Sequence, residues 1–108
     1  MSTAEAATRA LEFLSGPEKW IKDDFAGPIG RPDRVCLGNA LLLAKCGSLT
    51  AWIQGEPEYE AAWEIITAQF PGRVAAWRSA LRGVPAFNDH PDTTFDEVRM
   101  VLEKMAAG

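Results

Sequence analysis

The fold is decided by residues 34–47, which read RVCLGNALLLAKCG. Apolar side chains fill most of this segment, as expected for a helix that neighbours cover on several sides. Gly47 stands where a glycine commonly ends a helix. Gly38 costs a helix roughly 1 kcal/mol relative to alanine, so we expect it to let another backbone approach closely. The segment therefore predicts a central buried helix.

Further helices are predicted on both sides of this segment. Ser2 and Thr94 are each followed three residues later by Glu, which is the capping-box spacing that begins a helix. Another helix is expected from Pro57 to the Pro-Gly pair at 71–72. A shorter one carries Val74, Trp77 and Leu81 on its apolar side and is expected to end at Gly83 and Pro85, before an irregular turn over residues 84–93.

The segment 17–33 is rich in Pro, Gly and charged residues and is interpreted as a long irregular loop. Trp20, Ile21 and Phe25 are expected to hold it against the helices. A loop of this length without regular structure is unusual in a compact domain unless it is functional. The expected fold is an all-α, compact bundle of about five helices with a long irregular loop after the first helix, forming one domain over residues 1–108.

Composition excludes several classes of protein. The chain has 108 residues, 47% of them hydrophobic, and a net charge of −4, so it needs neither metal nor disulfide to form a core. The acidic balance disfavours nucleic acid as a partner. No apolar run is long enough for a membrane span, and no secretion signal precedes the first helix. Cys36 and Cys46 would lie about 15 Å apart on one helix, too far for a disulfide. We therefore expect a cytoplasmic protein with reduced thiols and no membrane partner.

Two stretches resemble a family of short bacterial and phage proteins that is classed only as a domain of unknown function. Residues 84–98 read VPAFNDHPDTTFDEV, and their Asn88-Asp89 pair and the following helix start match the family's pattern. Residues 34–41, RVCLGNAL, resemble the family's cysteine-containing helix, and Trp20 stands where the family tends to carry a Trp. Phe87 replaces the usual Trp, and Asn39 interrupts a Gly-Ala step. The resemblance implies a coherent fold and no particular reaction.

One combination of residues could support catalysis. Cys36 as nucleophile, His90 as base and Asp89 or Asn88 as the group that orients the base would give a thiol-dependent hydrolase. The simpler interpretation is that Cys36 is a small buried hydrophobe and His90 a turn residue. No group of His, Cys, Asp and Glu has a recognised metal-ligand spacing, so neither a metal nor a cofactor is predicted.

The remaining polar residues favour a structural role. Asn88 and Asp89 are expected to organise the entry to the last helix by bonding nearby backbone groups, and Thr94 and Glu97 to cap it. Asn39 would need hydrogen-bond partners if buried. The alternative is a binding surface in which the turn at 84–93 presents Phe87, Asn88 and His90 to a ligand.

Charged and aromatic residues supply the other candidates for binding. Acidic residues gather at 56–64 and Arg73, Arg78 and Arg82 follow, so the two helices that carry them are expected to pair and to neutralise each other. The alternatives are an acidic docking surface, or an arginine strip that binds an acidic partner or a phosphate. Trp63 and Trp77 fall on expected core positions. Trp20 and Trp52 lie in irregular segments and are candidates for interface anchors, where Trp is enriched.

These features favour a small non-enzymatic cytoplasmic module that binds another protein or a second copy of itself. The first alternative is a regulatory domain responsive to a small molecule or nucleotide, with a pocket between loop 17–33 and turn 84–93. The thiol-dependent hydrolase using Cys36 and His90 is the more distant alternative.

Overall fold

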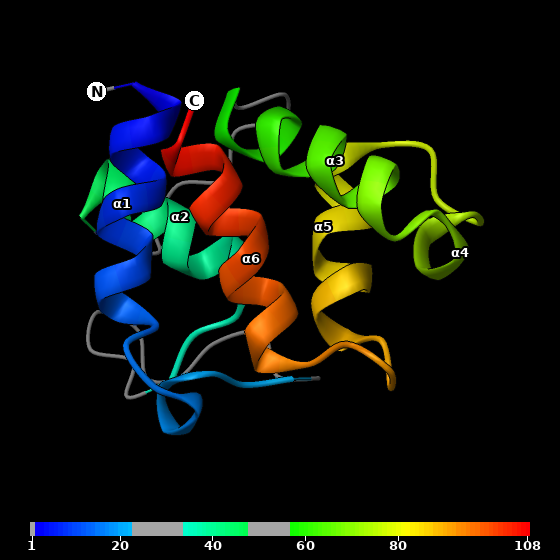
Figure 1. Ribbon diagram of the computed structural model, residues 1–108, viewed down its shortest axis with the longest axis horizontal. Helices are drawn as coiled ribbons and strands as arrows, with labels where there is room; N and C mark the ends of the chain where they lie inside the picture. Colours follow the sequence, from blue (N-terminus) through cyan, green and yellow to red (C-terminus); the bar gives the residue numbers. More distant parts are fainter. Residues whose placement is uncertain (1, 23–33, 48–56) are drawn as a thin grey trace.

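The computed structural model of the protein describes residues 2–22, 34–47 and 57–108. The helices in these residues are α1 (Thr3–Phe13), α2 (Leu37–Cys46), α3 (Pro57–Gln69), α4 (Pro71–Val74), α5 (Ala80–Asp89) and α6 (Phe95–Ala106), with a 3₁₀ turn η1 (Pro17–Lys19) (Figure 1). Within the described ranges no β-strand is formed, apart from an isolated parallel bridge between Trp20 and Val35. The predicted all-α bundle is confirmed.

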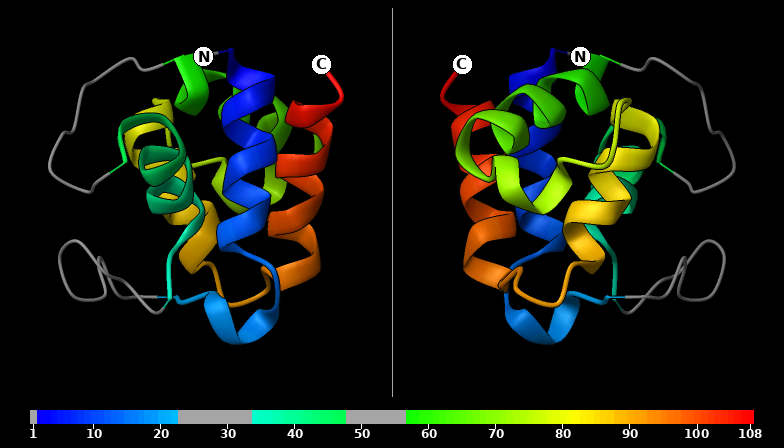
Figure 2. Two further views of the ribbon diagram at one scale, coloured as in Figure 1. Left: turned by 90° about the vertical axis from the view of Figure 1, so that its left-hand side faces the viewer. Right: turned by 90° about the vertical axis from the view of Figure 1, so that its right-hand side faces the viewer.

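Helices α1 and α6 lie side by side along one flank of the molecule (Figures 1 and 2). Both begin at the predicted capping boxes. The Ser2 hydroxyl accepts the Glu5 backbone N–H at 3.1 Å, and the Glu5 carboxylate accepts the Ser2 N–H at 3.0 Å. Thr94 and Glu97 repeat this arrangement in α6. Buried residues of each helix recur three or four positions apart, so each contributes one apolar face to the core.

Helix α2 is the central element, and residues Leu37 to Ala44 are buried. It begins later than predicted because residues 34–36 are extended: the Val35 N–H donates to the Lys19 carbonyl at 2.8 Å, and its carbonyl accepts the Ile21 N–H at 3.2 Å. The predicted end is confirmed, since Gly47 adopts the left-handed conformation with φ 75°. A Cβ at Gly38 would overlap the Tyr59 hydroxyl, so the neighbour at this glycine is a side chain and not the backbone expected.

The predicted helix ending at Gly83 and the irregular turn over 84–93 are wrong in part. Helix α4 ends at Val74, residues 75–79 form an exposed connection, and α5 continues through Gly83 and Pro85. Packing outweighs the loss of one backbone hydrogen bond at Pro85. The buried residues of α5 recur at helical spacing and line one face: Ala80, Gly83, Val84, Phe87 and Asn88.

The charge pairing expected between 56–64 and the arginines also differs. Glu58 is 3% exposed, and its Oε1 lies 3.0 Å from Lys45 Nζ of α2. Arg73 pairs with Glu97 of α6 instead of with α3. Glu56 lies outside the described residues. The Glu60 and Glu64 carboxylates of α3 are therefore exposed to solvent, whereas the Glu58 carboxylate pairs with Lys45 of α2.

Candidate functional site

A buried amide, that of Asn88 near the end of α5, joins three separate segments of the chain. Its Oδ1 accepts the indole N–H of Trp20 at 2.6 Å and the backbone N–H of Leu37 at 3.0 Å. Its Nδ2 donates to the Ile21 carbonyl at 2.9 Å and to the Asp89 carboxylate at 3.0 Å. All four hydrogen-bonding positions of the amide are therefore used within the protein. This geometry suits a structural brace and leaves no capacity for a ligand.

The segment around Trp20 is attached to the α5–α6 connection by further contacts. Lys22 Nζ donates to the His90 carbonyl at 2.8 Å and lies 5.4 Å from the centre of the Trp20 ring. The Trp20 ring also packs against Phe95 at the start of α6, with centroids 6.1 Å apart. Trp20 is consequently half-buried, and its polar N–H is already bonded. These contacts give Trp20 a role in holding residues 19–22 in place.

Two other residues predicted for binding have internal partners as well. Phe87 is fully buried and packs on Phe70, with ring centroids 5.1 Å apart. The Nδ1 atom of His90 accepts the Asp92 backbone N–H at 3.0 Å, so this ring organises the turn before α6. Trp52 lies outside the described residues.

The environment of Cys36 opposes thiol chemistry. Its Sγ caps α2 by accepting the Asn39 backbone N–H at 3.4 Å. Burial raises the pKa of the thiol, and the charge of Asp89 raises it further. A nucleophilic cysteine needs the opposite shift, because the thiolate is the reactive form. Asn39 is itself buried, on the first turn of the same helix.

Titratable groups do not gather into a metal-binding cluster in the described part of the chain. No set of three His, Cys, Asp or Glu side chains there is arranged to hold an ion. The strongest charged contact at this end of the molecule is the pair between Arg73 and Glu97, in which Arg73 Nη2 lies 2.9 Å from Glu97 Oε2. The hydrogen bonds from Arg73 lower the pKa of Glu97. This pair links α4 to α6, so the Arg73 guanidinium is already paired within the protein.

The exposed connection between α4 and α5 carries a different kind of surface. Trp77 is 41% exposed, although the sequence pattern predicts it in the core, and its backbone N–H donates to the Val74 carbonyl at 2.9 Å. Arg78 and Arg82 are exposed and make no hydrogen bond or ion pair with the residues that the structure describes. We refer to Trp77, Arg78 and Arg82 as the Trp–Arg surface.

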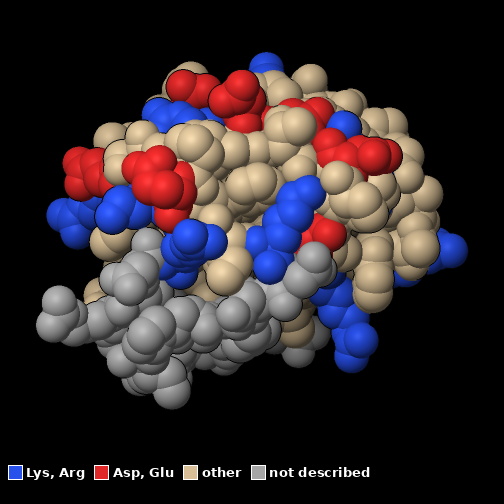
Figure 3. All heavy atoms as spheres, turned by 90° about the horizontal axis from the view of Figure 1, so that it is seen from below, with Lys and Arg blue, Asp and Glu red and all other residues tan. Residues whose placement is uncertain are grey.

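A sequence signal for this surface exists. Residues 65–88 contain three Arg and no Asp or Glu, in a chain whose net charge is −4. On the face shown in Figure 3, by contrast, acidic and basic side chains are interspersed. Arg78 and Arg82 are candidates from the sequence, whereas Trp77 is not, because its spacing from Val74 and Leu81 predicts a helix face that does not form.

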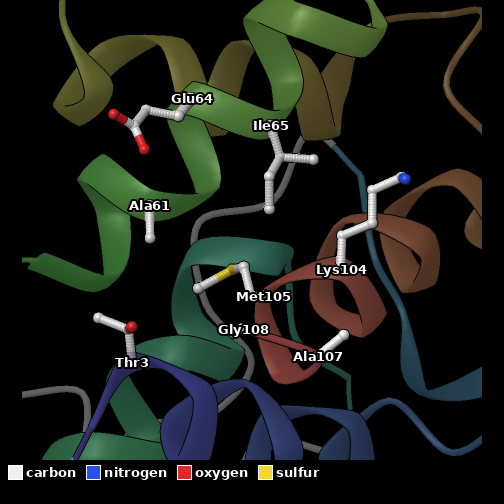
Figure 4. A pocket seen from close by; sticks show the side chains of 8 residues that line it. All are labelled: Thr3, Ala61, Glu64, Ile65, Lys104, Met105, Ala107 and Gly108. Atoms are coloured by element: carbon white, nitrogen blue, oxygen red, sulfur yellow. The ribbon is translucent and has the colours of Figure 1, made fainter.

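A hollow lies beside the middle of α3, where this helix meets the start of α1 and the end of α6 (Figure 4). Ala61 and Ile65 of α3 and Met105 of α6 form its apolar lining, and Glu64 and Lys104 stand on opposite sides of it. The pocket expected between loop 17–33 and turn 84–93 involves residues 23–33, which lie outside the described part. In that region the described Lys22 is bonded to the carbonyls of His90 and Pro91.

The structure defines a small helical domain with a buried hydrogen-bond network around Asn88 and an exposed connection that carries Trp77 and Arg78. The chain belongs to a family of unknown function, DUF6197, whose model matches residues 1–108. The expected membership of an uncharacterised family is thereby confirmed. No protein of curated function and no solved structure matches the chain. None of the helices formed by the described residues combines the length and apolar character needed to cross a bilayer.

Proposed function

We propose that the protein is a non-enzymatic interaction module that binds another protein through the Trp–Arg surface. The exposed indole of Trp77 is the observation that carries this proposal. Trp and Arg are the side chains that most often dominate the binding energy of protein interfaces. Arg78 directly follows Trp77, and Arg82 lies on the first turn of α5; neither has a partner among the described residues, so their charges are available to an acidic partner.

The rest of the described structure supports a binding role over a catalytic one. The thiol of Cys36 has a raised pKa, the Asn88 amide is fully hydrogen-bonded within the fold, and Nδ1 of His90 accepts the Asp92 backbone N–H. We extend the proposal to a protein of the cytoplasm, because the free thiol of Cys36 suits a reducing compartment. A bacterial or phage source is proposed on the resemblance of residues 84–98 and 34–41 to short bacterial and phage proteins.

Affinity capture with matched variants tests this function. The wild-type protein, Trp77→Ala and Phe13→Ala are immobilised and the retained proteins are compared. Phe13 is the matched control because it is 42% exposed, nearly the same as Trp77, and lies on α1. We expect a protein that wild type and Phe13→Ala retain, that Trp77→Ala loses, and whose retention falls as salt rises. Equal retention by wild type and Trp77→Ala would contradict the proposal.

A further inference from the structure

Helix α3 connects two surfaces of complementary character. Its middle residues Ala61, Glu64 and Ile65 line the hollow shown in Figure 4. Its C-terminal end leads through α4 into the exposed connection that carries the Trp–Arg surface (Figure 1). One surface offers an exposed indole with two arginines, and the other offers a recess lined by apolar and polar side chains, with carboxylates on its α3 side and Lys104 on its α6 side.

The hollow has the composition that would receive an indole. Ile65 points into it, Met105 closes it from the side of α6, and Ala61 leaves room because its side chain is small (Figure 4). Its volume is about 570 Å³, more than one indole ring occupies. Burying a large aromatic side chain in an apolar recess is among the strongest single contributions to an interface.

The charges around the two surfaces also match. Glu60 and Glu64 lie one helical turn apart on α3 and are both exposed. Lys104 extends on the opposite side of the hollow from Glu64 (Figure 4). An incoming arginine pair therefore meets carboxylates on the α3 side. Glu60 and Glu64, like Arg78 and Arg82, make no side-chain ion pair with the described residues.

The geometry points to a second copy of this chain as the occupant: the Trp–Arg surface of each copy docks on the hollow and on Glu60 and Glu64 of the other. This inference deepens the proposed function and rests on it. The hollow lies along the middle of α3 and the Trp–Arg surface lies beyond its C-terminal end, so two copies that exchange these surfaces make the same contact twice. Such a reciprocal contact closes as a dimer with two-fold symmetry and does not grow into a chain.

Charge reversal tests the contact. The three samples are the full chain with Arg78→Glu and Arg82→Glu, the full chain with Glu60→Arg and Glu64→Arg, and an equimolar mixture of the two. Dimerisation is measured by sedimentation equilibrium at submillimolar concentration. We expect wild type to dimerise, and each variant alone to dimerise at least about tenfold more weakly, which is a change of about 1.4 kcal/mol. The mixture is expected to regain wild-type affinity, because both reciprocal contacts again join opposite charges.

The controls separate docking from folding. Arg9→Glu reverses an exposed charge on α1 and is expected to leave the dimer unchanged. Recovery in the mixture shows at once that both variants fold. A wild-type chain that stays monomeric, a ladder of larger species, or failure of the mixture to recover would each overturn the dimer. If the wild-type chain is monomeric but retains a different protein in a Trp77-dependent way, the proposed function stands and this inference alone fails.

Discussion

The Asn88 side-chain oxygen accepts the indole N–H of Trp20 at 2.6 Å, across 68 residues of sequence. The same oxygen accepts the Leu37 backbone N–H, and the amide nitrogen donates to the Ile21 carbonyl. One fully buried amide thus positions the end of α5, the start of α2 and the segment after η1. A buried polar network of this kind stabilises the fold only while every member keeps its partner.

Asn88→Ala is expected to lower the free energy of unfolding by roughly 2–4 kcal/mol, because it leaves buried donors and an acceptor without partners. Denaturation by urea, followed by circular dichroism, measures the change. Trp20→Phe is the control, since it removes a single bond to Asn88 and keeps an aromatic ring at this position, and the lost bond should cost about 1 kcal/mol. Equal losses for the two variants would contradict a brace centred on Asn88.

Much of this arrangement could be predicted from the sequence because its signals are local. The capping boxes at Ser2 and Thr94 and the glycine at Gly47 specify helix ends through a few neighbouring residues, and each forms as predicted. The partners of Asn88 could not be predicted, since Trp20 and Leu37 approach it only through the tertiary fold. A polar residue's identity does not reveal which distant segment it contacts.

The error at α5 has a different origin. Gly83 and Pro85 were interpreted as a helix stop from their local preferences, whereas the spacing of Ala80, Val84 and Phe87 predicts a continuous buried face. Tertiary packing overrode the local signal. A helix that ends at Gly83 would place Trp77 on a core face. The Trp–Arg surface could therefore not be predicted, because it depends on Trp77 lying in the exposed connection.

The pair formed by Arg73 and Glu97 predicts a pH dependence. Because the hydrogen bonds from Arg73 lower the pKa of Glu97 in the folded state, the unfolded state binds the proton more readily. The stabilisation is therefore fully present above the ordinary glutamate range and is lost as pH falls through the lowered pKa. Glu97→Gln should lose about 1 kcal/mol at neutral pH and little in acid, measured as urea midpoints at both pH values.

The Gln variant separates this pair from the helix cap that Glu97 also forms. Gln can still accept the Thr94 backbone N–H in a capping box, so only the ionic partner of Arg73 is removed. Arg73→Lys should produce a similar loss, because an ammonium group cannot bond both carboxylate oxygens as the guanidinium does. A Glu97→Gln loss of the same size in acid as at neutral pH would contradict an ionic origin.

Gly83→Ala tests the close packing between α3 and α5. A Cβ at this position would overlap the indole ring of Trp63, and the strain should exceed the gain of about 1 kcal/mol in helix propensity. We expect a net loss of roughly 1–2 kcal/mol in the free energy of unfolding, partly restored by the smaller ring of Trp63→Phe. Gly72→Ala is the control, because nothing lies within 4 Å of its added Cβ, and it should be neutral or stabilising.

Cys36 should behave as an inert structural thiol. Burial raises its pKa, so in a Cys46→Ser background a thiol reagent should modify the folded protein more slowly than the urea-unfolded protein. The rate should increase with pH only above the range of an ordinary cysteine. Cys36→Ser should preserve stability, because serine caps a helix well, and should leave dimerisation unchanged. Rapid modification of the folded protein at neutral pH would instead indicate an activated thiolate and would contradict the non-enzymatic interpretation.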